Sequence, residues 1–144
     1  MDCPGSDKRY GFHIAAEPAS PSERLYVFES PIDLMSHATL AILEHGGQTA
    51  WRYDSRLSLA GTNEAALPFF LNQHKTVKEL IFCLDNDVPG RVASQVMQRL
   101  YPEKGYTTKI ELSQRKDYND DLQAHKRQIK AEKSIKQIHR GVDI

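Results

Sequence analysis

The chain has 144 residues, which is enough for one domain with a sizeable hydrophobic core. Its 19 basic and 19 acidic residues give a formal net charge of zero, so overall charge does not single out a nucleic-acid partner. No apolar run approaches the length of a membrane span, and no signal-peptide pattern is present, so we expect a cytoplasmic protein without a membrane partner.

The two cysteines agree with a reducing compartment. Cys3 and Cys83 have neither the spacing of a metal knuckle nor that of a redox pair. Cys83 lies inside an apolar run, so we expect it to be a small buried hydrophobic residue.

The first 24 residues predict a peripheral segment. Residues 8–14 can form a short strand, and residues 17–23 are rich in proline and serine, which is typical of a loop. We interpret residues 1–24 as the remnant of a preceding domain, and we expect the chain to belong to a longer protein.

The next segment predicts a strand followed by a helix. Residues 25–29 are apolar up to an acid, Glu29, and Ser30 and Pro31 are favoured at helix starts. Asp33 would lie in the first turn, where the helix dipole favours a carboxylate. The helix is expected to bury apolar residues at helical spacing and to stop at two glycines: Ile32, Leu34, Met35, Ala38, Ile42 and Leu43, then Gly46 and Gly47.

Two short strands and a helix are predicted next. The strands are expected at residues 49–53 and 57–60. A helix over residues 64–74 can be capped by Thr62 or Asn63. Its apolar face consists of Leu67, Phe70 and Leu71. Pro68 is tolerated only if it lies in the first turn of this helix.

Residues 80–91 form the most informative stretch. The five apolar residues 80–84 are typical of a strand buried on both faces. Asp85 and Asp87 follow where this strand should end, and Pro89 suits the first turn of a helix over residues 89–101. Its apolar positions are Val92, Val96, Met97 and Leu100.

The C-terminal part predicts a turn at residues 101–105, a strand at 107–112 and a polar, acidic loop at 114–121. A helix is expected over residues 122–140, with six basic residues against the single acid Glu132: Lys126, Arg127, Lys130, Lys133, Lys136 and Arg140. A basic helix face of this kind is either solvated surface or a contact for nucleic-acid phosphates, in which case affinity falls steeply with salt.

Strands that alternate with helices predict an α/β fold with a mainly parallel sheet. The carboxyl ends of parallel strands share one edge, so Glu29, Asp85 and Asp87 should converge there, joined by Asp117 if its strand is also parallel. Crowded carboxylates favour a hard cation such as Mg²⁺. Each acid alone is equally well explained as a helix cap or a solvated residue, and only their convergence indicates a site.

Two other interpretations of the Asp-x-Asp stretch are weaker. A calcium-binding EF-hand loop begins in the same way, but Pro89 stands where an oxygen ligand is needed and Val96 where the closing glutamate belongs. An aspartate-nucleophile phosphatase would use Asp85 as the nucleophile and Asp87 as the acid–base group. Such enzymes normally open with this motif, whereas here it falls past the midpoint of the chain.

The order of these motifs resembles the TOPRIM domain, most closely that of bacterial primases and of primase-like proteins on mobile elements. The stretches that carry the resemblance are residues 27–33 (Val-Phe-Glu-Ser-Pro-Ile-Asp), 58–62 (Ser-Leu-Ala-Gly-Thr), 82–91 (Phe-Cys-Leu-Asp-Asn-Asp-Val-Pro-Gly-Arg) and 116–120 (Lys-Asp-Tyr-Asn-Asp). The resemblance covers about residues 25–122, and residues 123–144 remain as a basic, helical C-terminal tail.

The resemblance implies a compact, Rossmann-like fold with Mg²⁺ or Mn²⁺ at the carboxyl edge of its sheet. It implies that Glu29 is a general acid or base and that Asp85 and Asp87 bind the metal. The other expected site residues are Asp117 as a metal ligand, Asp33 and Asp120 as additional acids, and Arg91 and Lys116 as contacts for phosphate.

Two positions depart from the family pattern. Ser30 stands where the family usually has glycine, which narrows the site. Asn119 stands where primases often carry a second aspartate, which would weaken a second metal site. The cysteine–histidine zinc motif and the basic subdomain that accompany the TOPRIM domain in cellular primases are not found in this sequence.

We therefore expect the metal-binding domain of a primase-like nucleotidyltransferase. It would use nucleoside triphosphates to make RNA primers during DNA replication of a chromosome or a mobile element. A nuclease or topoisomerase-type domain that cleaves DNA strands is the alternative, followed by a non-catalytic module that binds nucleic acid. We expect the isolated domain to need other parts of a longer chain for activity.

Overall fold

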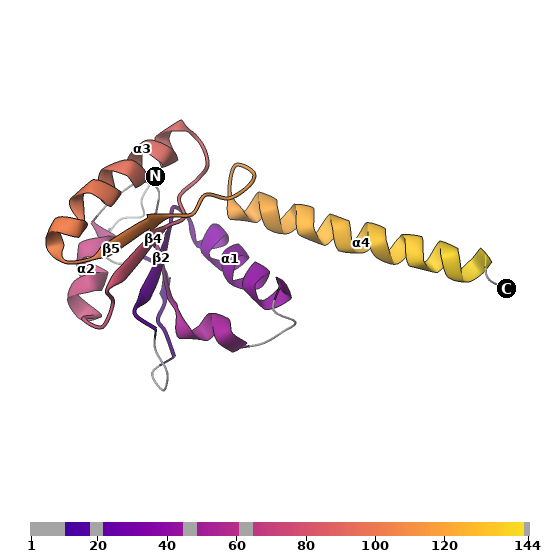
Figure 1. Ribbon diagram of the computed structural model, residues 1–144, viewed down its shortest axis with the longest axis horizontal. Coiled ribbons are helices and arrows are strands. Elements are labelled where there is room, and N and C mark those ends of the chain that lie inside the picture. The colour runs from indigo at the N-terminus through magenta and orange to yellow at the C-terminus, as the bar shows by residue number, and fades with distance from the viewer. Residues whose placement is uncertain (1–10, 18–21, 45–48, 61–64, 143–144) are drawn as a thin grey trace, which may run out of the picture.

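The computed structural model describes residues 11–17, 22–44, 49–60 and 65–142, which form one five-stranded sheet with helices on both faces (Figure 1). The strand order is β1-β3-β2-β4-β5, and all neighbouring strands are parallel except β1, which runs antiparallel to β3. This confirms the predicted α/β class. The strands are β1 (His13–Ile14), β2 (Arg24–Phe28), β3 (Ser55–Ser58), β4 (Glu79–Phe82) and β5 (Thr107–Ile110).

The helices lie in two layers. Helices α2 and α3 cover one face of the sheet, while α1 and the beginning of α4 cover the other (Figure 1). In the described ranges, no helix is both long and apolar enough to cross a membrane. The helical segments are α1 (Pro31–Glu44), α2 (Ala66–Gln73), α3 (Val88–Leu100) and α4 (Tyr118–Val142), with the 3₁₀ helices η1 (Thr49–Tyr53) and η2 (Pro102–Lys104).

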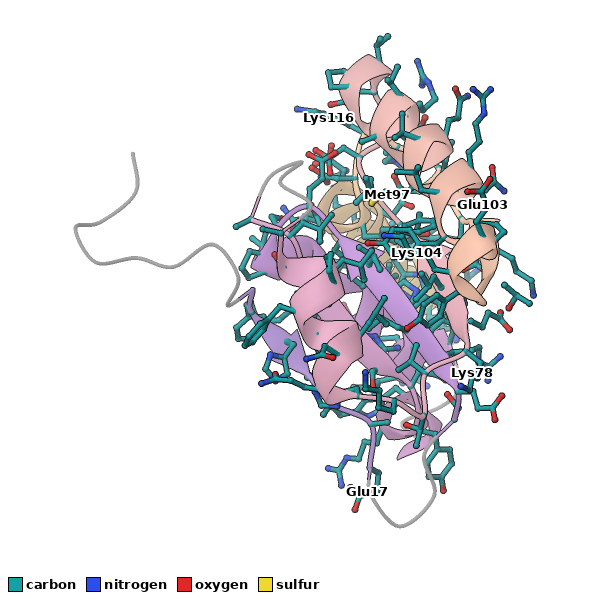
Figure 2. The ribbon with its side chains drawn as sticks, turned by 90° about the vertical axis from the view of Figure 1, so that its left-hand side faces the viewer. Glu17, Lys78, Met97, Glu103, Lys104 and Lys116 are labelled. Carbon is teal, nitrogen blue, oxygen red and sulfur yellow. The ribbon has the colours of Figure 1, made fainter. Side chains whose placement is uncertain are left out.

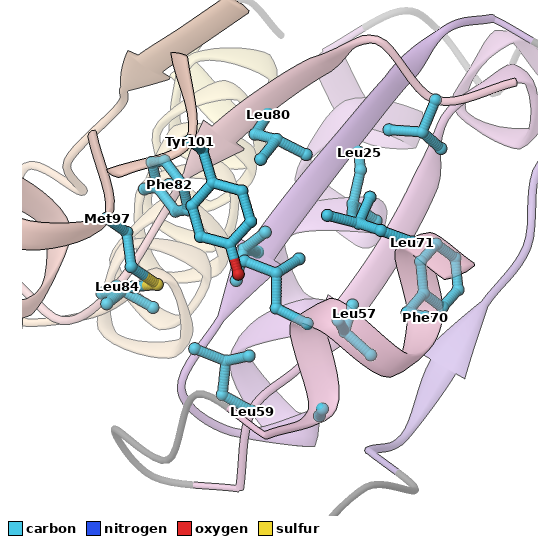
Figure 3. Close-up of a cluster of buried hydrophobic side chains, with 14 residues drawn as sticks. Leu25, Leu57, Leu59, Phe70, Leu71, Leu80, Phe82, Leu84, Met97 and Tyr101 are labelled. Atoms are coloured by element: carbon cyan, nitrogen blue, oxygen red, sulfur yellow. The ribbon is translucent and has the colours of Figure 1, made fainter. Parts of the chain in front are cut away.

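The central strands β2 and β4 are apolar on both faces because both faces are covered. Alternate residues point in opposite directions along a strand. Phe28 of β2 and Ile81 of β4 therefore face Leu34 of α1. Their neighbours along the strands join the larger core cluster on the opposite face, which includes Leu25, Val27, Leu57, Leu80, Phe82 and Met97 (Figure 3). This core holds the ends of β2 and β4 side by side.

The predicted apolar faces of α1 and α3 are only partly correct. Leu34, Ala38 and Met97 are buried, as expected. Six other residues that the spacing assigned to these faces are between 41% and 54% exposed: Ile32, Met35, Leu43, Val92, Val96 and Leu100. The helices therefore lie on the sheet partly through small or polar residues that are buried beside the three predicted ones; these are Asp33, Ser36, Gly90 and Ser94.

Small residues explain how α3 packs. Gly90 and Ser94 are on its buried face, and the Ser94 hydroxyl donates a 2.8 Å hydrogen bond to the Gly90 carbonyl. A Cβ atom added to Gly90 would lie 2.1 Å from the backbone oxygen of Asp85. The first turn of α3 thus approaches the β4–α3 loop through its backbone, a mode of packing that apolar spacing does not reveal.

Residues 49–53 form the helix η1, so the predicted strand is wrong. Strand β3 already has β1 on one edge and β2 on the other, so it offers no free edge to a further strand. The carbonyl of Trp51 instead accepts a 2.7 Å hydrogen bond from the guanidinium of Arg56, which is 1% exposed. Arg56 thereby gains a partner that replaces the water it has lost.

The other predicted boundaries shift by a few residues. The strand expected at residues 57–60 is β3, and the strands expected to end at residues 84 and 112 end at Phe82 and Ile110. Pro68 lies in the first turn of α2, and α4 begins at Tyr118, so the predicted acidic loop ends earlier. Three predicted features lie outside the described residues: the caps Thr62 and Asn63, the pair Gly46 and Gly47, and residues 8–10.

We predict that Gly90→Ala destabilises the protein by about 1–3 kcal/mol, because its methyl group overlaps the backbone of Asp85. This outweighs the gain of about 1 kcal/mol that alanine normally brings to a helix interior. Urea unfolding followed by circular dichroism measures the effect. Gln95→Ala, on the exposed side of α3, is the control and should stay within about 0.5 kcal/mol of the parent. A Gly90→Ala protein as stable as the parent would show that the loop relaxes freely.

Candidate metal centre

An acidic edge forms where β2 and β4 end. Glu29 directly follows β2, and Asp85 lies in the loop after β4. Because the two strands are adjacent and parallel, their carboxyl ends lie together. The loop before α4 reaches the same edge, and its Lys116 lies far from Lys78, which precedes β4 at the opposite edge of the sheet (Figure 2).

Three carboxylates meet at this edge. Asp33, Asp85 and Asp117 each offer one oxygen, and these three oxygens lie within 4.8 Å of one another. Asp33 comes from the first turn of α1, Asp85 from the β4–α3 loop and Asp117 from the residue before α4. We call these three residues the aspartate triad.

Hydrogen bonds from nearby groups fix two members of the triad. The Oδ2 atom of Asp33 accepts a 2.8 Å hydrogen bond from the Ser30 hydroxyl, and its Oδ1 atom accepts one from the Asn119 backbone N–H at 3.1 Å. The Oδ1 atom of Asp117 accepts a 2.8 Å hydrogen bond from the backbone N–H of Asp120. These hydrogen bonds therefore set the positions of both side chains.

Glu29 and Asp87 lie beside the triad and make different contacts. The Oε1 atom of Glu29 accepts a 3.2 Å hydrogen bond from the backbone N–H of Asp85. The Oδ1 atom of Asp87 accepts a 2.8 Å hydrogen bond from the backbone N–H of Gly90 and so caps α3. The two acids of the Asp-x-Asp stretch thus have different surroundings: Asp85 belongs to the triad, and Asp87 caps a helix.

Asn86 joins the two loops of the site, a role that the sequence pattern did not indicate. Its backbone N–H donates to the carbonyl of Lys116 at 2.6 Å, and its side-chain amide donates to the carbonyl of Ser113 at 2.9 Å. Its Oδ1 atom accepts a 2.9 Å hydrogen bond from Arg91. Ser30 was also noted only as a departure from a family pattern, yet its hydroxyl holds Asp33.

The crowding of acids changes their proton affinity. Burial, and then the negative charges of Glu29, Asp33, Asp117 and Asp87, raise the pKa of Asp85 to about 7. Burial also raises the pKa of Glu29, and the hydrogen bond from the Asp85 N–H opposes this shift. At neutral pH the edge therefore carries charge that its own protein groups do not neutralise.

The triad fits a hard divalent cation. Carboxylate oxygens are the ligands that Mg²⁺ prefers, at about 2.1 Å, which places ligands on opposite sides of the ion about 4.2 Å apart. Oxygens already within 4.8 Å of one another need only small side-chain movements to reach such positions. A cation would also offset the repulsion that raises the pKa of Asp85.

The remaining predicted residues lie around the triad. Asp120 is exposed in the first turn of α4, where the helix dipole favours its charge. Arg91 and Lys116 are exposed, and both are tied to Asn86, Arg91 through its side chain and Lys116 through its carbonyl. The positive charge of Lys116 opposes the rise in the pKa of Glu29, which places it near that carboxylate.

A second group of possible ligands, on the α1/α4 face, does not suit a metal ion. His37, Cys83 and Glu111 also bring ligand atoms within 4.8 Å of one another. However, Nδ1 of His37 accepts a hydrogen bond from Nε of Arg56, so a neutral ring carries its proton on Nε2 and has no free lone pair. Burial and Arg56 lower the pKa of His37 to about 3, and burial raises the pKa of the Cys83 thiol.

A cleft lies beside this second group and away from the triad. It has a volume of about 770 Å³ and is lined by residues of α1, η1, β2, β3 and α4, including Trp51 and Arg56. None of the acids of the triad lines it. The triad is therefore identified by its charged groups and not by a cleft.

Residues 26–122 match the sequence model of a family described as Toprim-like. The chain belongs to this Toprim-like family. TOPRIM domains bind divalent metal ions, and the aspartate triad supplies ligands of the right kind at the expected edge of the sheet. The family match confirms the resemblance that the motifs indicated.

The Toprim-like domain also shares its fold with a solved structure, the primase fragment of the bacteriophage T7 primase-helicase protein. The TM-score is 0.51 and the sequence identity 18%, and the match covers 78% of this chain and 44% of that chain. This chain therefore spans less than half the length of the phage fragment. A search of curated protein sequences found no significant match.

We predict that Asp85→Asn raises the melting temperature of the metal-free protein at pH 8. Because the folded state raises the pKa of Asp85 from 3.8 to about 7, stability is greatest when this carboxyl is protonated and is lost as pH rises through about 7. The gain from the neutral amide should therefore be largest above pH 7 and disappear near pH 4.

Thermal unfolding in a chelating buffer across this pH range is the measurement. Asp120→Asn, an exposed acid outside the triad, is the control and should show no such gain. A lower melting temperature of Asp85→Asn at pH 8 would contradict the proposed repulsion.

Proposed function

We propose that this domain binds Mg²⁺ or Mn²⁺ through Asp33, Asp85 and Asp117 and acts in nucleotidyl transfer, as the catalytic metal-binding domain of a primase-like protein. The observation that supports this most directly is the aspartate triad at the carboxyl edge of a TOPRIM sheet. When bound, the cation would offset phosphate charge and stabilise the attacking and leaving oxygens. The substrates would be nucleoside triphosphates and a nucleic-acid template, and the product an RNA primer.

Glu29 is the proposed general acid or base. Its Oε1 atom is held by the backbone N–H of Asp85, which leaves Oε2 as the atom to exchange a proton with substrate. Burial raises its pKa toward the working pH, as a proton-transfer group requires. The same hydrogen bond fixes Glu29 relative to the triad.

Asp87, Asp120 and the two exposed cations have supporting roles in this proposal. The charge of Asp87 contributes to the raised pKa of both Asp85 and Glu29, and because its Oδ1 atom caps α3, its Oδ2 atom would be the one to assist a cation. Asp120 holds Asp117 through its backbone N–H. Arg91 and Lys116 would contact the phosphates of a bound nucleotide.

Strand cleavage by a topoisomerase mechanism has less support. It requires a tyrosine nucleophile near the acids, and Tyr118 follows Asp117 directly. Its hydroxyl donates a 2.8 Å hydrogen bond to the carbonyl of Glu111, and its ring packs edge-on against Phe28 and His37. Burial raises the pKa of the Tyr118 hydroxyl, so less of the nucleophilic phenolate forms at neutral pH.

Metal binding tests the first half of the proposal. Calorimetry should show binding of Mg²⁺ and Mn²⁺ with millimolar or lower Kd, and Asp85→Asn/Asp117→Asn should weaken it at least about tenfold, because two of three ligands lose their charge. Asp120→Asn is the matched control and should bind almost as the parent does. Equal affinity in the parent and the double variant would place the ion elsewhere and remove the triad from the proposal.

Catalysis tests the second half. In the longest available form of the protein, Glu29→Gln should lower template-directed incorporation of labelled nucleotides by about 10²–10⁴-fold, the usual contribution of a general acid or base. Its affinity for the metal should stay close to that of the parent. Nicking of DNA without added nucleotides would favour strand cleavage instead. Nucleic-acid binding without any turnover, unchanged in Glu29→Gln and Asp85→Asn, would favour a non-catalytic module.

A further inference from the structure

The zero net charge of the chain conceals an uneven distribution. Residues 123–142, which we call the arm, carry six lysine and arginine side chains and a single acid, Glu132, so the rest of the chain is net acidic. The arm is the C-terminal part of α4, which confirms the helix that the sequence predicted there. Neither the triad nor the proposed reaction uses any of these basic residues.

The arm leaves the body of the domain. Leu122 is 6% exposed and packs near α1, but every residue from 130 to 140 is exposed. Figure 1 shows α4 extending as a single helix well beyond the sheet and the other helices. A surface of this kind is available to a partner along most of its length.

Four of the six basic residues of the arm form one row, and Arg127 lies outside it, about 100° around the helix from Lys126. Lys126, Lys130, Lys133 and Arg140 follow one another at intervals of three, four or seven residues, and such intervals place side chains on one side of a helix. Lys136 lies beside this row. From Lys126 to Arg140 the row is about 21 Å long at 1.5 Å per residue. Three apolar residues of the arm, Ala131, Ile135 and Ile138, lie on the opposite side, whereas Ile129 lies on the same side as the row.

Repulsion between the charges of this row destabilises the helix of the arm when no partner is bound. Like charges three or four residues apart destabilise a helix by a few tenths of a kcal/mol per pair. Among the described residues, no side chain of the row forms an ion pair. Glu132 accepts a hydrogen bond from Gln128, at 3.3 Å, so even the single acid is engaged elsewhere. A partner with regularly spaced negative charges would remove this repulsion.

We propose that the basic row of the arm binds the phosphate backbone of nucleic acid and leads the strand to the acidic edge. About one cation per 5 Å faces a polymer that carries one charge every 3.4 Å along each strand, so each lysine can reach its own phosphate. The row begins at Lys126, nine residues after Asp117 and so about 14 Å along α4, and a strand that continues past Lys126 toward the start of α4 would reach the triad. The destination of the strand rests on the proposed function, but the binding itself does not.

An acidic membrane surface is the competing partner for a helix that is basic on one side and apolar on the other. Helices that lie on membranes usually insert tryptophan, phenylalanine or leucine. The arm has none of these residues, and its apolar side has only two large members, Ile135 and Ile138. The observations therefore favour nucleic acid.

The test is binding of fluorescently labelled single-stranded and duplex DNA to the full chain, measured by anisotropy in a chelating buffer between about 50 and 200 mM salt. The parent should lose affinity steeply with salt. Lys130→Gln/Lys133→Gln/Lys136→Gln should bind at least tenfold more weakly at 100 mM salt. It should also reduce the slope of log affinity against log salt by about 3, because each lysine removed leaves one phosphate without a cation. Glutamine retains helix propensity, so the arm should still form.

The matched control removes the same charge from the body through three other exposed lysines: Lys75→Gln/Lys78→Gln/Lys104→Gln. It should bind DNA within twofold of the parent. The chelating buffer removes free cations, so DNA binding by the arm does not require the metal site, and a failure of that site leaves this proposal standing. A flat salt response, an equal loss in both triple variants, or binding to phosphatidylserine vesicles but not to DNA would overturn it.

Discussion

The repulsion between carboxylates that the backbone holds together is the constraint on which the acidic edge depends. Parallel pairing of β2 and β4 brings Glu29 and Asp85 to one edge, and α1 and α4 add Asp33 and Asp117. Backbone N–H groups offset part of this negative charge through hydrogen bonds. Burial of Asp85, together with the charge that remains, raises its pKa, and this uncompensated charge is the physical reason for a cation at this position.

The close packing of α3 serves the same edge. Because Gly90 has no side chain, the first turn of α3 can approach the backbone of Asp85, and the same absent Cβ would otherwise lie 2.9 Å from Oε1 of Glu29. Asp87 caps this turn and Asn86 ties the loop to the segment before α4. The position of Asp85 is therefore determined by backbone contacts on both sides, which suits a ligand that has to be in place before the ion arrives.

The sequence was sufficient for the fold and for the edge where the acids meet, because strand–acid–helix order and parallel pairing together imply that convergence. It was insufficient for the composition of the triad. Whether Asp33 or Asp87 faces Asp85 depends on which backbone N–H each side chain meets, and both lie next to a helix start. The buried face of α3 was mispredicted for a similar reason, since Gly90 and Ser94 pack closely without contributing to apolar spacing.

The triad joins three segments that are far apart in the sequence. A cation held there would act as a reversible crosslink between the first turn of α1, the loop after β4 and the residue before α4, and α1 and α4 also pack against each other. A ligand that binds only the folded state adds stability in proportion to the logarithm of its concentration above Kd. The acids that weaken the metal-free fold would then make its stability depend on the concentration of free cation in the surrounding solution.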